Sequence, residues 1–113
     1  MATPEARDKA RIKKRVAEAL KVRQLPAKMH WNAGTGLGVP RLDFDGVIAG
    51  HPFYVEVKRF DGLGKLTARQ SSDLRDYKEA GALAMVIDSE ETLEQFVSWI
   101  LLLEPRSETH PVP

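Results

Sequence analysis

The fold is decided by residues 42–59, whose sequence is LDFDGVIAGHPFYVEVKR. Two runs rich in β-branched and aromatic residues, Leu42–Ile48 and Phe53–Arg59, flank the segment Ala49–Pro52, which contains the turn formers glycine and proline. This pattern predicts two antiparallel strands that pair as a hairpin.

On the N-terminal side of the hairpin, Thr3-Pro4-Glu5 has the residue types of a helix start. An amphipathic helix is predicted from there to about Arg23, because apolar residues recur at helical spacing: Ile12, Val16, Ala19 and Leu20. A short strand at 28–32 and the glycine-rich loop Gly34–Gly38 then lead into the hairpin.

On the C-terminal side, Thr67-Ala68-Arg69-Gln70 has the spacing of a capping box and predicts a helix that ends near Ala80. Residues 82–88 form an apolar run typical of a buried strand, and Ser89 begins a last helix that stops before Pro105.

The sequence therefore predicts an α/β (α+β) fold with a mixed central β-sheet and flanking helices, in the order αβββαβα. Residues 1–104 are expected to form a single domain, and residues 105–113 a flexible C-terminal tail.

Composition excludes several classes of protein. Of 113 residues, 42% are hydrophobic and 29% are charged, as in a globular domain and unlike a disordered chain. No apolar run approaches the roughly 20 residues of a membrane span, so a soluble, cytoplasmic protein is expected. The chain lacks cysteine, and its three histidines do not show ligand spacing, so any metal must be held mainly by oxygen.

Positive charge is concentrated at the N-terminal end. Residues 1–23 carry eight Lys and Arg against three Asp and Glu, whereas the rest of the chain is net negative. This asymmetry favours phosphate contact through the first helix, notably at Lys13, Lys14 and Arg15. The alternative is a basic helix surface that only faces solvent.

Carboxylates gather on one face of the predicted hairpin. Because side chains alternate along a strand, Glu56 and Lys58 share one face of the second strand, and Asp43 and Asp45 share one face of the first. A two-residue turn, 49–50, places Asp43 opposite Glu56, whereas a four-residue loop places Asp45 there. Local geometry favours the longer loop, since a type I′ turn would give an alanine a positive φ.

Two carboxylates at cross-strand distance repel each other, and a hard cation such as Mg²⁺ or Mn²⁺ relieves that repulsion. Such an ion would activate water and polarise a phosphoryl oxygen, while Lys58 could orient the water or stabilise the transition state. The residues thus point to metal-dependent phosphodiester hydrolysis. The alternative is ordinary cross-strand ion pairing on a solvated face.

Four segments in this order resemble the VRR-NUC family of the PD-(D/E)XK nuclease superfamily. They are GVPRLDFDG at 38–46, Gly50, FYVEVK at 53–58 and LTARQ at 66–70. The resemblance extends from about Thr3 to Asp88 and implies a restriction-endonuclease-like core with metal-dependent endodeoxyribonuclease activity.

Matched position by position, the resemblance implies that Asp43, Glu56 and the backbone carbonyl of Val57 bind the metal, that Lys58 is catalytic and that Gln70 contributes to the site. Glu5 matches a glutamate on the family's first helix. The sequence departs from the family because Arg41-Leu42 separates Pro40 from the acid. Asp45 is therefore an alternative to Asp43, although the family spacing to Glu56 favours Asp43.

Small members of this family are typical of phages and bacteria and resemble Holliday-junction resolvases that act as homodimers. The resemblance therefore implies branched DNA as the substrate, a homodimer, and a location in the bacterial or phage-infected host cytoplasm. Arg41, Lys65 and Arg69 flank the predicted site and are expected to contact phosphate. The loop at 34–38 lacks the lysine and the strand-to-helix context of a P-loop, which argues against NTP binding.

The competing hypothesis is a non-catalytic nucleic-acid-binding module that uses the basic first helix. Acids that face an anionic ligand would weaken such binding, so the carboxylates of the hairpin argue for chemistry. Metal-dependent cleavage is the observation that separates the two.

Overall fold

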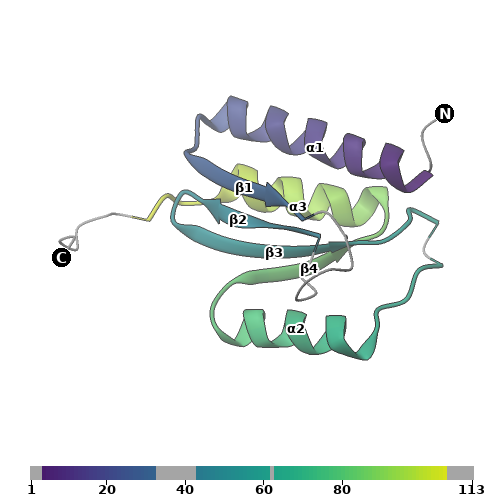
Figure 1. The fold of residues 1–113 in the computed structure, drawn as a ribbon. Coiled ribbons are helices and arrows are strands. Elements are labelled where there is room, and N and C mark those ends of the chain that lie inside the picture. Colours follow the sequence, from purple (N-terminus) through teal and green to yellow (C-terminus); the bar gives the residue numbers. More distant parts are fainter. Residues whose placement is uncertain (1–3, 33–42, 62, 107–113) are drawn as a thin grey trace.

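A computed structural model describes residues 4–32, 43–61 and 63–106, and the side chains of Pro4 and Glu5 lie outside this description. Three helices surround one sheet of four strands (Figure 1). The elements are α1 (Pro4–Arg23), β1 (Ala27–Trp31), β2 (Phe44–Ile48), β3 (His51–Val57), α2 (Ala68–Glu79), β4 (Leu83–Ile87) and α3 (Glu90–Leu102). The predicted α+β class and the order αβββαβα are confirmed.

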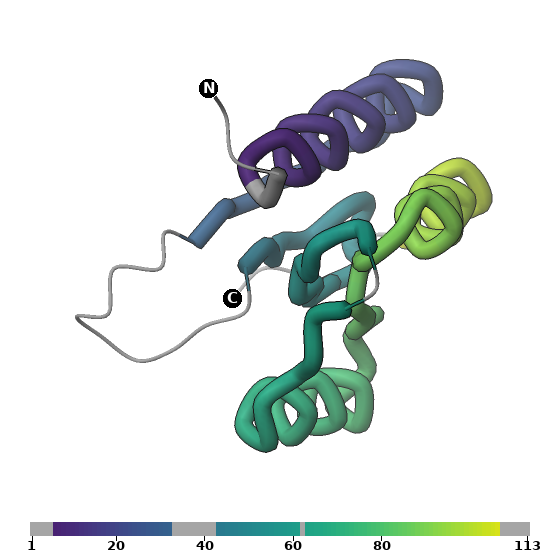
Figure 2. Tube along the Cα trace, turned by 90° about the vertical axis from the view of Figure 1, so that its right-hand side faces the viewer, coloured from purple at the N-terminus to yellow at the C-terminus, as the bar shows by residue number. Residues whose placement is uncertain are grey.

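The sheet has the strand order β1-β2-β3-β4. β1, β2 and β3 are antiparallel neighbours, whereas β3 and β4 are parallel, because α2 returns the chain to the end of the sheet at which β3 began. In Figures 1 and 2 the strands lie between α1 and α2, and α3 lies beside the sheet.

The core lies between one face of the sheet and helices α1 and α3. Phe44 of β2 and Phe53 of β3 are fully buried and contact Phe96 of α3, with ring centroids 6.1 and 5.3 Å from that ring. Ile12 and Val16 of α1 close the same core. Side chains alternate between the two faces of a strand. Because the apolar residues of β2 and β3 face the core, Asp45 and Glu56, which alternate with them, face the other side of the sheet.

The hairpin turn has two residues, Ala49 and Gly50, and both have positive φ, 51° and 87°. Of the two loop lengths considered, the two-residue turn is the one observed, and the longer loop that local geometry favours is wrong, because His51 and Pro52 pair with β2. Pro52 faces Val47 in a position that needs no hydrogen bond to β2, and the pairing of β3 with β4 starts only at Phe53. Its missing N–H therefore removes no bond from either ladder.

The predicted starts of α2 and α3 are observed. Thr67 accepts a hydrogen bond from the Gln70 backbone, and the Gln70 side chain accepts one from the Thr67 backbone. Ser89 and Thr92 form the same reciprocal cap at α3. At the other end of the chain's described part, the Arg106 amide donates to the Ala49 carbonyl, so residues 105–106 contact the hairpin turn.

None of the helices described here is long and apolar enough to cross a membrane. The predicted glycine-rich loop at 34–38, residues Arg41 and Leu42, and tail residues 107–113 lie outside the described residues.

Candidate active site

The two-residue turn decides which acid of the first strand faces Glu56. Phe44 pairs with Val55, and one further step in the same register places Asp43 opposite Glu56. Asp43 lies one residue before β2, and its Oδ2 accepts a hydrogen bond of 3.0 Å from the backbone N–H of Val57. The register therefore brings together Asp43 and Glu56, the pair that the family spacing favours.

Asp45 has a different environment. It pairs with Tyr54 in the register, and its Oδ2 accepts a hydrogen bond of 3.0 Å from the Asn32 side chain, next to β1. Among the described hydrogen bonds, Asp45 makes none to Glu56 or Lys58.

Glu56 is the buried charged residue of the described chain, with 4% of its surface exposed. Burial raises the pKa of Glu56 to about 8, and a side-chain hydrogen bond with Asp43 and the negative charge of Asp43 act in the same direction. The positive charge of Lys58 opposes this shift. At neutral pH the pair therefore holds a proton that a bound cation would displace.

Lys58 follows β3 directly and stays on the same side as Glu56. Its Nζ lies 3.8 Å from Glu56 Oε1 and donates a hydrogen bond of 3.0 Å to Gln70 Oε1. The Lys58 backbone N–H donates to the Ile87 carbonyl of β4, which fixes the residue at the end of the sheet.

Gln70 joins the helix cap to the acid pair. Its Oε1 accepts from both the Thr67 backbone and Lys58, and its Nε2 donates to Glu56 Oε1 at 3.0 Å. Gln70 therefore caps α2 and at the same time contacts the side chains of Glu56 and Lys58. Because one amide serves both purposes, the start of α2 is held at a fixed distance from Glu56.

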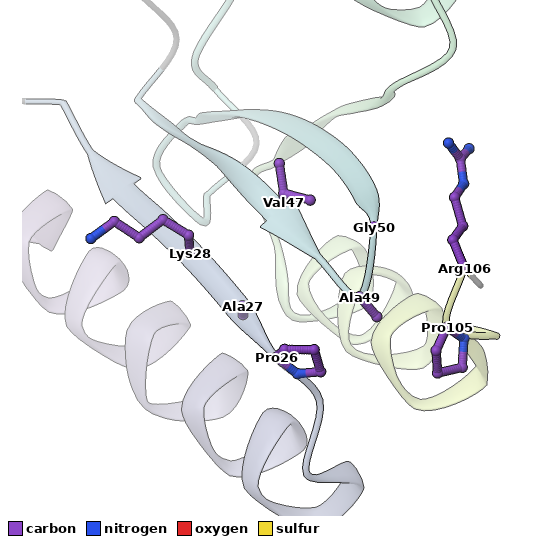
Figure 3. Close-up of a pocket in the computed structure, with 8 residues that line it drawn as sticks. All are labelled: Pro26, Ala27, Lys28, Val47, Ala49, Gly50, Pro105 and Arg106. Atoms are coloured by element: carbon purple, nitrogen blue, oxygen red, sulfur yellow. The ribbon is translucent and has the colours of Figure 1, made fainter. Parts of the chain in front are cut away.

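The acid pair and Lys58 line a cavity of about 310 Å³, whose lining residues are Asp43, Glu56, Val57, Lys58, Arg59, Leu63 and Gly64. A larger cavity, about 480 Å³, lies at the opposite end of β2 and β3, around Ala49, Gly50 and Pro105 (Figure 3). Its lining is mostly apolar and contains no acid, so it offers no groups for metal binding or hydrolysis.

The donor set of the smaller cavity suits a hard divalent cation. Two carboxylates converge there, and Val57, whose backbone carbonyl is the third expected ligand, lines the same space. Within the described residues, no group of three or more His, Cys, Asp or Glu side chains converges. Protein oxygen atoms at this site would therefore leave several positions of an octahedral ion to water or substrate.

Lys9 is a site residue that the sequence analysis did not identify. Its Nζ lies 3.5 Å from Asp43 Oδ1, so a second ammonium group reaches the acid pair from α1. Its position three residues before the buried Ile12 places it beside the apolar stripe of α1, but the sequence does not reveal which strand end that side of the helix approaches.

The predicted phosphate-binding residues have different surroundings. Lys14, Lys65 and Arg69 are exposed, and Lys13 lies over the Trp31 ring, with Nζ 4.8 Å from its centroid. One guanidinium nitrogen of Arg15 donates to both carboxylate oxygens of Glu94 in α3, at 2.6 and 2.8 Å. These bonds, together with one to Glu18, raise the pKa of the Arg15 guanidinium.

Arg15 therefore connects α1 to α3 and does not extend freely into solvent. Glu5 lies in α1, but its side chain is outside the described part of the chain, as is all of Arg41.

Comparisons with protein-family models, with curated proteins and with solved structures find no match to this chain.

Proposed function

We propose that this protein is a Mg²⁺- or Mn²⁺-dependent endonuclease that hydrolyses phosphodiester bonds in DNA. The observation that carries the proposal is the buried Glu56, which shares a cavity with Asp43 and Lys58. Burying two carboxyl groups side by side costs a fold stability, and carboxyl groups with strongly raised pKa values cluster at functional sites.

Asp43 and Glu56 would hold the ion, together with the Val57 carbonyl. A bound Mg²⁺ or Mn²⁺ would polarise a phosphoryl oxygen and lower the pKa of a bound water. Lys58 lies close enough to Glu56 to stabilise negative charge that develops on the phosphate. Gln70 forms hydrogen bonds with both the Lys58 ammonium and the Glu56 carboxyl group, and so fixes their positions relative to each other.

Lys9 would contribute to binding of the substrate. In the absence of another cation it is attracted to Asp43, and a metal at the acid pair would release this ammonium toward a phosphate of the bound strand.

The resemblance to the VRR-NUC family supports branched DNA, such as a Holliday junction, as the substrate, and a homodimer as the active form. A dimer with twofold symmetry could cut two strands symmetrically, which a single chain of this size has little surface to do.

The test is incubation of the purified protein with labelled four-way junctions, flaps and linear duplex, with and without Mn²⁺. Metal-dependent cleavage by the wild type, lost in Glu56→Gln and retained in Glu79→Gln on the exposed end of α2, is the expected result. DNA binding without cleavage in any metal would instead favour the non-catalytic nucleic-acid-binding module.

A further inference from the structure

Asp43 lies outside β2, so its position depends on a few contacts. On one side the Val57 N–H holds its carboxylate, and on the other the backbone N–H of Asn32 donates to its carbonyl at 2.8 Å. The pairing of β1 with β2, extended by one residue, makes Asn32 the direct neighbour of Asp43.

The Asn32 side chain forms the centre of a chain of hydrogen bonds on the same face. Its Nδ2 donates to Asp45 Oδ2 at 3.0 Å, and its Oδ1 lies 2.8 Å from Nδ1 of His30, which must donate because the amide oxygen can only accept. His30 is itself the cross-strand partner of Asp45. The amide thus links two residues of β1 and β2 through both of its ends.

This His30-Asn32-Asp45 network lies on the surface and not in the core. The His30 ring is exposed, Asn32 and Asp45 are half-buried, and α2 contacts β3 and β4 on the remaining part of the sheet. On the opposite face of the sheet, Trp31 stacks on the buried Phe44, with ring centroids 4.2 Å apart, and holds this end of β1 against β2. On the polar face no such packing fixes the side chains of Asn32 and Asp45, so their orientation depends on the hydrogen bonds of Asn32.

From this arrangement we infer that Asn32 is a positioning residue of the metal site. Its side chain fixes Asp45 and the start of β2, and through its own backbone bond it sets where Asp43 presents its carboxylate to Glu56. His30 and Asp45 hold the Asn32 amide in that orientation. The inference rests on the proposed function, since it concerns the same acid pair.

The amide can be exchanged with its carboxylate partner, which provides a sharp test. Asn32→Asp alone places two carboxylates 3.0 Å apart, whereas Asn32→Asp combined with Asp45→Asn restores both hydrogen bonds with the same total charge. Asn32→Ala removes the network without adding charge. Lys28→Ala, on the same face of β1 but outside the network, is the control.

The measurement is the single-turnover cleavage rate at saturating DNA and Mn²⁺, alongside DNA affinity in Ca²⁺. Asn32→Ala and Asn32→Asp should lower the rate roughly 10–100-fold, the usual effect of losing a group that orients a metal ligand, and leave DNA affinity within about twofold. The double variant should recover a rate within about threefold of the wild type, and Lys28→Ala should keep the wild-type rate.

A wild-type rate in Asn32→Ala, or a double variant as slow as Asn32→Asp, would overturn the inference. If the Asn32 variants fail to fold, as judged by circular dichroism, His30→Ala removes only the exposed end of the network and should still slow the reaction severalfold; an unchanged rate there also overturns it. A wild-type protein that cleaves no DNA would instead overturn the proposed function, before any network variant is compared.

Discussion

At the scale of single residues, the acid pair has a measurable signature that does not depend on any substrate. The pKa of Glu56 is raised to about 8 in the folded chain, from an ordinary value of 4.5. Between these two pH values the folded chain therefore holds one proton more than the unfolded chain at this position. By linkage, the free energy of unfolding must fall as pH rises through this window.

Glu56→Gln should abolish this fall, because a neutral amide has no proton to lose. Urea unfolding at pH 5 and pH 8.5 should show a decrease of a few kcal/mol in the wild type that is mostly absent from the variant, since each pKa unit corresponds to about 1.4 kcal/mol. Glu79→Gln, at an exposed position, should retain the wild-type decrease. Equal pH dependence in wild type and Glu56→Gln would show that Glu56 titrates normally.

Lys58→Met should lower the single-turnover rate by at least about two orders of magnitude and leave Mn²⁺ affinity similar or higher. In the proposed mechanism the ammonium group would act on the water or the transition state, and it would compete with a cation for Glu56, which lies 3.8 Å away. Isothermal titration calorimetry and a cleavage assay on the same sample separate the two effects. Loss of the metal site in this variant would contradict the role given to Lys58.

At the scale of elements, the hairpin turn sets the register on which the site depends. Ala49 adopts a positive φ of 51°, which is unfavourable for a residue with a Cβ and severe for a β-branched one. The compensating contacts are the Ala49 amide and carbonyl bonds to Pro26 and Arg106, which tie the turn to segments outside the hairpin.

Ala49→Gly should therefore leave the free energy of unfolding unchanged or raise it by up to about 1 kcal/mol, whereas Ala49→Val should lower it by about 2 kcal/mol or more. Chemical denaturation of the two variants provides the comparison. If Ala49→Val had the same free energy of unfolding as Ala49→Gly, residue 49 could not have a positive φ, and the two-residue turn would be contradicted.

Much of the fold could be predicted from the sequence because its signals are local. The capping boxes at Thr67 and Ser89 and the apolar stripe of α1 each depend on residues within a few positions of one another. The register of β2 against β3 could not be predicted on local grounds, because contacts from Pro26 and Arg106, distant in the sequence, stabilise a turn that alanine disfavours.

The residues of the candidate site likewise divide into those with a signal in the sequence and those whose positions depend on contacts distant in the sequence. Glu56 and Lys58 could be placed on one face of the hairpin by strand alternation. The choice of Asp43 over Asp45 and the contribution of Gln70 could be predicted only from the resemblance to the VRR-NUC family. Lys9 and Asn32 could not, because their roles depend on how α1 and β1 pack against the start of β2.

At the scale of the whole molecule, the cations of α1 fall into two groups. Arg11 and Arg15 pair with Glu90 and Glu94 of α3, and Arg23 donates to backbone carbonyls at the end of α3, so these cations join the two helices. Exposed cations such as Lys14 have no such partner among the described contacts and are available to a phosphate backbone.

Neutralising Lys13 and Lys14 to Gln should weaken binding to all DNA substrates similarly and reduce the slope of log affinity against log salt by about one to two. Arg15→Gln should leave that slope unchanged and lower the free energy of unfolding by less than about 1 kcal/mol, as for other partly exposed ion pairs. A reduced salt slope in Arg15→Gln would mean that DNA binding breaks the pair with Glu94.

Whether Asp43 or Asp45 acts with Glu56 is the most direct test of the proposed site. The answer depends on the hairpin turn, on the register that this turn sets and on the proposed chemistry together. The measurement is the single-turnover cleavage rate of Asp43→Asn and Asp45→Asn on one four-way junction at saturating Mn²⁺. We predict that Asp43→Asn abolishes cleavage and that Asp45→Asn, whose Asn32 hydrogen bond an amide oxygen can still accept, retains a substantial part of the wild-type rate. An active Asp43→Asn beside an inactive Asp45→Asn would contradict the site as assigned.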